Sequence, residues 1–164
     1  MSNGNPLLVL WRNLYFVHAL VRDELHERLA AEAGCTLVEH DLMAWLAASP
    51  GRRLRMLDLA RRLRITPGGL TRVADRLVER GWLIREPPPA NRREVYAVLT
   101  EPGVGVLRSA RRVYARVLRE TLARHLDARE LDALSGLLGK LLDALADVYA
   151  SESPQRLVRQ GRVL

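Results

Sequence analysis

The fold of this chain is decided by residues 54–100, which read LRMLDLARRLRITPGGLTRVADRLVERGWLIREPPPANRREVYAVLT. A short segment of helical period comes first, and a tight turn joins it to a longer segment of the same period. Two apolar runs rich in β-forming residues follow, with a proline-rich loop between them. Two short helices joined by a tight turn and followed by a hairpin are typical of a winged helix-turn-helix. We therefore predict a mainly α fold with a small antiparallel β-wing.

The longer of the two helices is expected to begin at Pro67 and to end just before Gly81. Thr66 can cap it, because a threonine hydroxyl accepts hydrogen bonds from the free N–H groups of the first turn. Proline is tolerated at the first helical position, and glycine suits the left-handed residue just past a helix end. The predicted buried face consists of Leu70, Val73, Ala74 and Leu77.

The opposite face of this helix carries small and polar residues, which predicts that it enters the major groove of double-stranded DNA. Small residues allow a close approach, and threonine and arginine side chains can reach base edges or phosphates. The residues predicted to contact DNA from this helix are Thr66, Gly68, Gly69, Thr71, Arg72 and Arg76. A helical hairpin with a solvated basic face is the other interpretation.

The segment after Gly81 is predicted to be a β-hairpin. Residues 82–84 and 94–99 are rich in β-forming residues, and the loop between them contains three consecutive prolines. Arg92 and Arg93 follow these prolines, where they suit a wing that lies along a DNA backbone or enters a narrow minor groove. A solvated turn is the other interpretation of this loop.

The run Asn91-x-Arg93-x5-Leu99-Thr100 resembles the wing signature of the MarR family of bacterial transcription regulators, D-x-R-x5-L-T, with asparagine in place of the family's aspartate. Residues 70–81 resemble the family's recognition helix, and the resemblance covers roughly residues 6–150. It implies that Arg93 enters the minor groove and that residues 52–56 add a third strand to the wing. It also implies a repressor that releases DNA when a small, often phenolic or anionic, molecule binds.

Helices on either side of this stretch are predicted to form a dimerisation module. Apolar residues recur at helical spacing over residues 7–29 and 131–148, and exposed apolar surfaces of that size are unusual on a monomer. Burial of the first helix within its own subunit is the other interpretation. One continuous helix is expected over residues 102–125. The expected organisation is a single domain (1–164) with a helical dimerisation module (6–34 and 101–150), a winged helix-turn-helix DNA-binding lobe (36–100) and a C-terminal tail (151–164).

Composition agrees with a nucleic-acid partner and gives no sign of catalysis. The formal net charge is +7 and the isoelectric point is about 10.6, which favours an anionic partner. The single cysteine, Cys35, cannot form an internal disulfide, and we see neither a signal peptide nor a long uninterrupted apolar run, so we expect a cytoplasmic protein without a membrane span. No nucleophile elbow, phosphate-binding loop or zinc-protease motif occurs, so we expect neither an enzyme nor a cofactor.

Aromatic and titratable residues on the first two helices indicate where a small aromatic or anionic effector could bind. The candidate pocket residues are Trp11, Tyr15, His18, His40, Asp41 and Trp45. Core packing of the aromatic residues is the other interpretation. Cys35 precedes a helix, where the N-terminal dipole can lower a thiol pKa, so a redox switch is a further alternative. The histidines, with Cys35, Glu39 and Asp41, could instead assemble a transition-metal site, although no tight ligand motif supports one.

Taken together, these patterns predict a homodimeric transcription regulator, most simply a repressor, that reads a pseudo-palindromic operator. Two alternatives belong to other classes of protein. A nucleoid-type protein would bind DNA without an effector and with little sequence preference. A helical interaction module would use its basic face for a protein partner.

Overall fold

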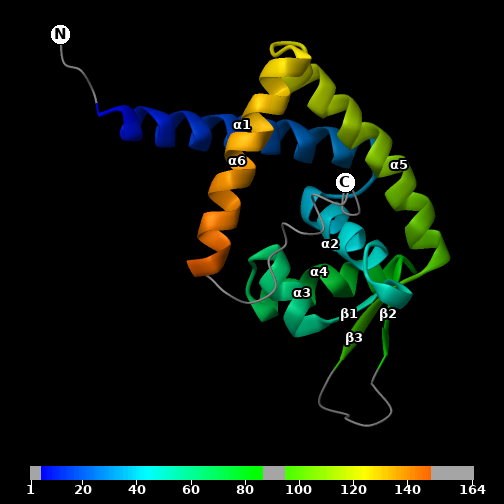
Figure 1. Ribbon diagram of the computed structural model, residues 1–164. Coiled ribbons are helices and arrows are strands. Elements are labelled where there is room, and N and C mark those ends of the chain that lie inside the picture. Colours follow the sequence, from blue (N-terminus) through cyan, green and yellow to red (C-terminus); the bar gives the residue numbers. More distant parts are fainter. Residues whose placement is uncertain (1–4, 87–94, 149–164) are drawn as a thin grey trace.

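The computed structural model describes residues 5–86 and 95–148. Helices α1, α5 and α6 lie over a smaller lobe built from the other helices and a three-stranded sheet (Figure 1). The helices are α1 (Pro6–Ala33), α2 (Leu37–Ala47), α3 (Met56–Leu63), α4 (Pro67–Glu79), α5 (Glu101–Leu118) and α6 (Ala128–Val148). The strands are β1 (Arg53–Arg55), β2 (Leu83–Glu86) and β3 (Tyr96–Leu99). The predicted fold class, mainly α with a small β-wing, is confirmed.

The three strands form one antiparallel sheet in the order β1-β3-β2. Leu83 of β2 lies opposite Leu99 of β3, and Arg55 of β1 lies opposite Tyr96. The third strand expected within residues 52–56 is therefore confirmed. The predicted wing tip, including Arg92 and Arg93, lies outside the described residues.

Local capping chemistry sets the ends of the helices. The Thr36 hydroxyl accepts from the Glu39 N–H at 3.3 Å, and the Glu39 carboxylate accepts from the Thr36 N–H at 2.9 Å. Gly34 ends α1 and Gly81 follows α4, with φ of +65° and +70°, a backbone conformation that glycine adopts without strain. The predicted start of α4 at Pro67 and its predicted end before Gly81 are therefore confirmed.

Helix α5 departs from the continuous helix expected over residues 102–125. It begins one residue earlier, because the Thr100 hydroxyl accepts from a first-turn N–H at 3.2 Å and caps it. A π-helical turn, η2 (Arg119–Ala123), follows the end of α5. The Thr121 hydroxyl donates to the Val117 carbonyl at 2.8 Å. Such a bond competes with the regular backbone ladder at the place where the α-helical pattern ends.

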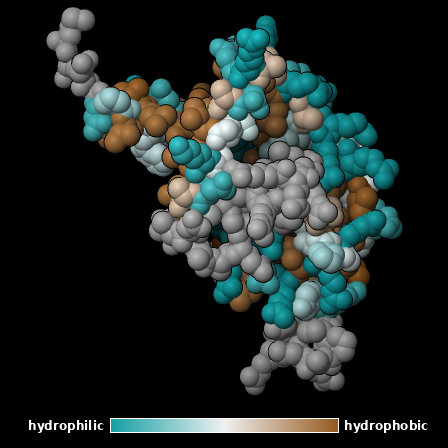
Figure 2. Space-filling model, in the orientation of Figure 1, coloured by the Kyte–Doolittle hydropathy of each residue, from teal (hydrophilic) through white to brown (hydrophobic). Residues whose placement is uncertain are grey.

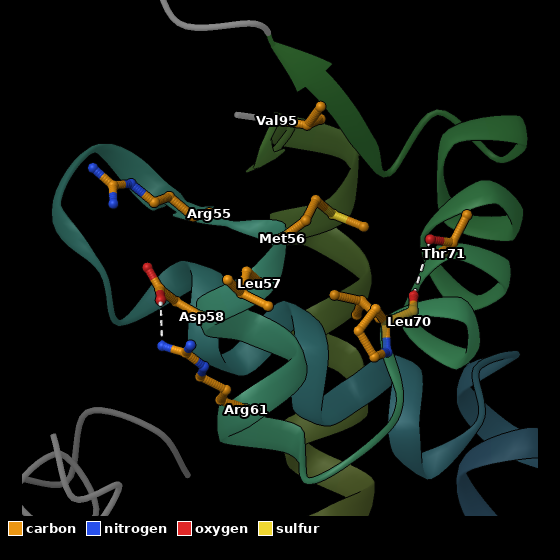
Figure 3. Close-up of a pocket in the computed structure, with 9 residues that line it drawn as sticks. Arg55, Met56, Leu57, Asp58, Arg61, Leu70, Thr71 and Val95 are labelled. Carbon is orange, nitrogen blue, oxygen red and sulfur yellow. Dashed lines mark hydrogen bonds and ion pairs between the residues drawn. The ribbon is translucent and has the colours of Figure 1, made fainter. Parts of the chain in front are cut away.

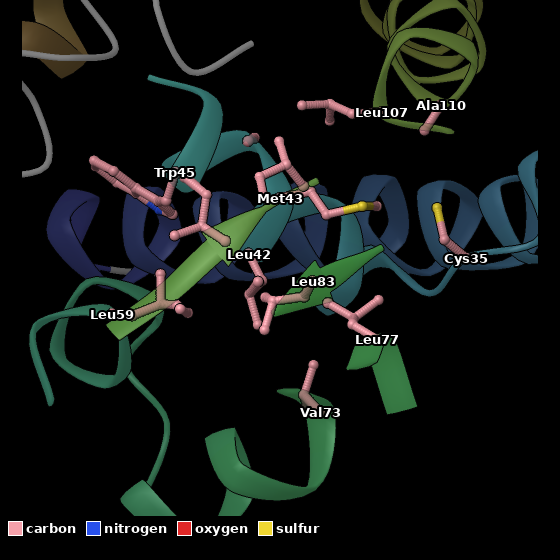
Figure 4. Close-up of a cluster of buried hydrophobic side chains, with 14 of the residues drawn as sticks. Cys35, Leu42, Met43, Trp45, Leu59, Val73, Leu77, Leu83, Leu107 and Ala110 are labelled. Carbon is pink, nitrogen blue, oxygen red and sulfur yellow. The ribbon is translucent and has the colours of Figure 1, made fainter. Parts of the chain in front are cut away.

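Helix α2 lies at the centre of the hydrophobic core. Seven of its eleven residues are buried, so this helix has almost no face left for solvent. Side chains from α3, α4 and the sheet pack around it (Figure 4), and the cluster includes Leu42, Met43, Leu59, Leu77 and Leu83. Because one face of α4 is held in this core, its opposite face must point outward.

Most of the exposed large apolar side chains lie on two helices, α1 and α6. The N-terminal part of α1 projects beyond the lobe (Figure 1), and apolar residues gather along it in Figure 2. Helix α1 buries only Leu25 and Leu29, and none of the α6 residues 128–145 is buried. The exposed leucines of α6 are Leu134, Leu137, Leu141, Leu142 and Leu145. Within residues 5–86 and 95–148 of one copy, neither helix therefore has a complete apolar partner.

None of the helices in the described part of the chain is long and apolar enough to cross a membrane.

Candidate nucleic-acid interface

Helix α4 presents one face to solvent because the other is anchored in the core. Leu70 and Leu77 are fully buried, whereas Gly68 and Arg72, on the opposite side of the helix, are exposed. A Cβ added at Gly68 would meet nothing within 4 Å, and a Cβ at Gly69 would meet only the Thr66 hydroxyl, at 3.1 Å. The backbone at the start of α4 is therefore open to the close approach of a groove.

The two threonines predicted to contact DNA are both bonded to the helix itself. The Thr66 hydroxyl accepts from the Gly69 N–H at 3.1 Å, and the Thr71 hydroxyl donates to the Pro67 carbonyl at 3.0 Å. Thr66 therefore keeps its hydroxyl proton for an acceptor such as a phosphate, and Thr71 keeps a lone pair for a donor. Both side chains also shape the first turn of α4.

The two arginines predicted on this face have different surroundings. Arg72 is exposed, and its guanidinium makes no hydrogen bond or ion pair with residues 5–86 or 95–148. The Nε of Arg76 donates to the Glu39 carboxylate at 3.0 Å, and the Arg76 side chain is only 46% exposed. Arg72 is therefore available to a partner, whereas Arg76 is already paired with the Glu39 carboxylate within the protein.

The carboxylate that binds Arg76 is deeply buried. Glu39 is 1% exposed. Burial by itself raises the pKa of this carboxyl, but the hydrogen bonds from Thr36 and Arg76 and the charge of Arg80 outweigh burial and hold the pKa below its ordinary value. Glu39 is therefore ionised at neutral pH, and it requires the cations around it.

Arg85, on β2, belongs to this surface although the sequence analysis did not single it out. Its guanidinium lies 2.7 Å from the Asp75 carboxylate of α4 and donates to the Thr71 carbonyl at 3.1 Å. Asp75 would otherwise repel a phosphate. The ion pair neutralises this negative charge on the exposed face of α4, which we call the reading face. Strand alternation was the available signal, because it places Arg85 on the same side as Leu83, which packs toward α4.

The base of the wing carries two further arginines around one aromatic ring. The Arg53 guanidinium lies 4.4 Å from the centre of the Tyr96 ring, and the Arg55 Nε donates to the Tyr96 hydroxyl at 3.0 Å. Stacking and hydrogen bonding hold both cations beside the sheet instead of leaving them free to move. They place positive charge at the base of the wing.

A groove of about 410 Å³ lies between the start of α3, the start of α4 and the end of the wing that leads into β3 (Figure 3). Its floor is apolar and its rim carries polar and charged groups. The lining residues are Arg55, Met56, Leu57, Asp58, Arg61, Pro67, Leu70, Thr71 and Val95. Thr71 and Pro67 belong to the first turns of α4, so the groove borders the reading face.

The residues predicted to form an effector pocket lie in two different environments. Trp11 and Tyr15 are 67% and 58% exposed on α1, and His18 is exposed beside them. His40 is buried and stacks on Tyr114 with ring centroids 4.6 Å apart, and its Nδ1 lies 2.9 Å from Asp41. Trp45 is buried in the core, with the Arg62 guanidinium 4.9 Å from its ring. The groove of Figure 3 contains none of the six predicted residues.

The structure also corrects the expectation for Cys35. Burial, with a smaller contribution from the charge of Glu39, raises the pKa of this thiol to about 11, so the effect of the following helix does not dominate. A thiol with such a pKa is a poor nucleophile at neutral pH, which removes the basis for a redox switch. Among the described residues, no group of three or more histidine, cysteine or acidic side chains could hold a metal ion.

Comparison with known proteins gives matches to members of the MarR family. A sequence profile described as MarR family matches residues 33–94. The Escherichia coli multiple antibiotic resistance protein MarR is 35% identical over 86 residues, which is 52% of this chain and 60% of that protein. The chain thus matches less than two thirds of the length of this relative.

Two solved structures extend the similarity over nearly the whole chain. Sco3205, a MarR family transcriptional regulator from Streptomyces coelicolor solved in complex with DNA, is 30% identical, with a TM-score of 0.76 over 90% of this chain and 91% of that chain. A mutant of Escherichia coli MarR complexed with operator DNA is 27% identical, with a TM-score of 0.71 over 87% of this chain and 99% of that chain. Since profile, sequence and fold agree, the chain belongs to the MarR family of transcriptional regulators.

Proposed function

We propose that this chain is a cytoplasmic, non-catalytic repressor that binds a pseudo-palindromic DNA operator as a homodimer. The observation that carries the proposal is the exposed face of α4, with an open glycine backbone at its start and Arg72 unpaired within the described residues. Arg72 would contact a base edge, Thr66 and Thr71 would contact backbone or bases, and Arg92 and Arg93 would act from the wing. Two similar proteins, one solved in complex with DNA and the other with operator DNA, support the proposal that the chain binds DNA.

Dimerisation is proposed because α6 has no buried residue between 128 and 145 and α1 leaves most of its apolar side chains exposed. A second copy would supply an apolar surface of the same kind, and a two-fold interface is self-complementary. Helices α1, α5 and α6 (6–34 and 101–150) would then form the dimerisation module, and residues 36–100 the DNA-binding lobe. Two copies of α4 would enter successive major grooves about 34 Å apart.

The test combines mass measurement with selection of bound sequences from random duplexes. We expect a dimeric mass in light scattering and an enriched palindromic site. Leu137→Glu should give monomers, because Leu137 is 64% exposed in one copy and a buried carboxylate is costly. Asp132→Lys is the matched control, since this exposed position lies on the other side of α6.

Each possible failure points to a different conclusion. A wild-type monomer with native helicity would exclude the dimer. A dimer that binds DNA without enriching any sequence would favour the nucleoid-type alternative. A dimer that binds no duplex at moderate salt would favour the protein-interaction alternative.

The proposed effector would be a small aromatic anion, and the groove of Figure 3 would be its site. The apolar floor suits a ring, Arg61 and Arg55 suit a carboxylate, and an occupant beside Thr71 would hinder the approach of α4 to DNA. We expect millimolar benzoate to raise the melting temperature of the DNA-free protein and to weaken duplex binding, because a ligand stabilises the state that binds it. Arg61→Gln should reduce both effects. Unchanged melting temperature and unchanged DNA affinity over the benzoate titration would exclude this site.

A further inference from the structure

The carboxylate of Glu39 lies where three parts of the chain meet. Its Oε2 accepts from the Thr36 N–H at 2.9 Å, which ties it to the start of α2. Its Oε1 accepts from the Nε of Arg76, on α4, at 3.0 Å. The Nη1 of Arg80, the residue directly after α4, lies 3.8 Å from Oε2 and also donates to the Gly34 carbonyl at 2.9 Å. The C-terminal half of α4 is therefore bonded to the corner between α1 and α2.

This connection is more directional than a surface ion pair. Glu39 is 1% exposed, so its carboxylate cannot exchange its protein partners for water without a large loss of free energy. Arginine guanidinium groups are planar and donate along defined directions. Arg80 also lies 4.9 Å from the Trp82 ring, which limits its movement further. The cluster therefore defines the orientation of α4, in addition to holding it close.

The cluster binds the C-terminal end of α4, so a small tilt there displaces the N-terminal end that would contact DNA, which we call the reading end. Eight residues separate Arg76 from Gly68, which is about 12 Å of helix, so a tilt of about 10° at the anchored end would move the reading end by about 2 Å. In a dimer the movement occurs in both copies and adds to about 4 Å. That exceeds the rise of one base pair, about 3.4 Å.

We infer that Glu39, through Arg76 and Arg80, is a positioning residue that sets the distance between the two reading helices and so specifies the spacing of the operator half-sites. The inference rests on the proposed function, because it requires a dimer that binds two half-sites. Helix α1, which ends at this corner, belongs to the proposed dimerisation module. The cluster is a direct polar link between that module and the reading helix.

The test measures affinity for duplexes that carry two selected half-sites separated by systematically varied spacers, at fixed salt. A rigid dimer should prefer its best spacer over the next by about tenfold or more, and we expect Glu39→Gln to reduce this ratio to about threefold or less. Base preference within each half-site should stay unchanged, because Arg72 is untouched. Glutamine also serves at this capping position, so α2 should remain capped.

Two variants separate positioning from charge and from stability. Glu79→Gln is the matched control, because Glu79 is exposed near the end of α4, and it should keep the wild-type spacing profile. Arg76→Lys keeps the net charge but lacks the planar group, and it should broaden the profile as Glu39→Gln does. A purely stabilising role would lower binding by the same factor at every spacer.

The outcomes distinguish failure of this inference from failure of the proposed function. A folded Glu39→Gln protein with the wild-type spacing profile would overturn the inference and leave the proposed function intact. If Glu39→Gln does not fold, Arg80→Gln takes its place, because the Arg80 side chain is half-exposed and Arg76 still binds Glu39 in that variant. A broadened spacing profile of Arg80→Gln would support the inference, and a wild-type profile would overturn it. A wild-type protein without any spacing optimum would instead contradict the proposed dimeric operator binding.

Discussion

Replacing Arg72 with alanine is expected to weaken operator binding by a factor between about 30 and about 10⁴. An arginine that pairs with a guanine edge contributes about 1–3 kcal/mol, and the dimer would lose two such contacts, about 2–6 kcal/mol in total. The free energy of unfolding should hardly change, because Arg72 is exposed and makes no hydrogen bond or ion pair with the described residues. Sequence selection with the variant should show a flatter base preference within each half-site.

Arg76→Ala is the variant to compare with it, since it removes the same charge one helical turn away but from a side chain that is bonded inside the protein. It should lower the free energy of unfolding by about 1–3 kcal/mol, because the buried Glu39 carboxylate loses a charged hydrogen-bond partner and keeps Thr36 and Arg80. The folded-state pKa of Glu39 is lowered, so its contribution to stability is present above the ordinary glutamate pKa and is lost as the pH falls through the folded value. The stability difference between this variant and wild type should therefore shrink in acid.

Fluorescence anisotropy with one operator and chemical denaturation over a pH series would measure both quantities. If Arg72→Ala keeps wild-type affinity and wild-type base preference, the assignment of α4 as the reading helix is wrong. If Arg72→Ala instead lowers affinity equally for every sequence and reduces the salt dependence, Arg72 contacts a phosphate and not a base.

Replacing Gly103 with alanine is expected to lower the free energy of unfolding by about 1–3 kcal/mol or more, as overpacked sites commonly do. A Cβ at Gly103 would lie 2.3 Å from the Trp82 carbonyl oxygen and 2.7 Å from a methyl group of Leu99. The carbonyl belongs to the backbone, and it cannot retreat freely because the Thr100 N–H donates to it at 3.1 Å. The start of α5 would have to move away from the base of the wing.

Gly105→Ala, two residues further along α5, is the control for helix propensity. A Cβ at Gly105 would meet nothing within 4 Å. The free energy of unfolding of this variant should therefore rise by about 0.5–1 kcal/mol, because alanine is favoured over glycine inside a helix. Thermal denaturation should therefore show a lower melting temperature for Gly103→Ala and a higher one for Gly105→Ala than for the wild type. Equal shifts would show that α5 does not pack against Trp82 as described.

Much of the fold could be predicted from the sequence because helix ends depend on residues close together in the chain. Thr66 and Pro67 start α4, Thr36 and Glu39 form a capping box, and Gly34 adopts the left-handed conformation expected after α1. Periodic leucines likewise predicted which face of α4 is buried. The wing signature added the third strand, which is too short for its own pattern to reveal.

The identity of charged partners could not be predicted in the same way. Glu39 and Arg76 are separated by 37 residues, and Arg85 meets Asp75 only because β2 packs beside α4. The sequence alone showed four ionisable side chains with no indication of which would meet.

Burial was the other property that only the tertiary structure decided. The position of Cys35 before a helix suggested a lowered thiol pKa as one alternative, yet the pKa is raised because the fold encloses the side chain. The candidate pocket residues were grouped because they are aromatic or titratable and lie on the first two helices, but the fold exposes Trp11 and buries Trp45. The sequence by itself determined the elements, their ends and their apolar faces, because neighbours within a few residues control them. Tertiary structure decided which charges pair and which side chains lose water, because both depend on segments that are distant in the chain and meet only after folding.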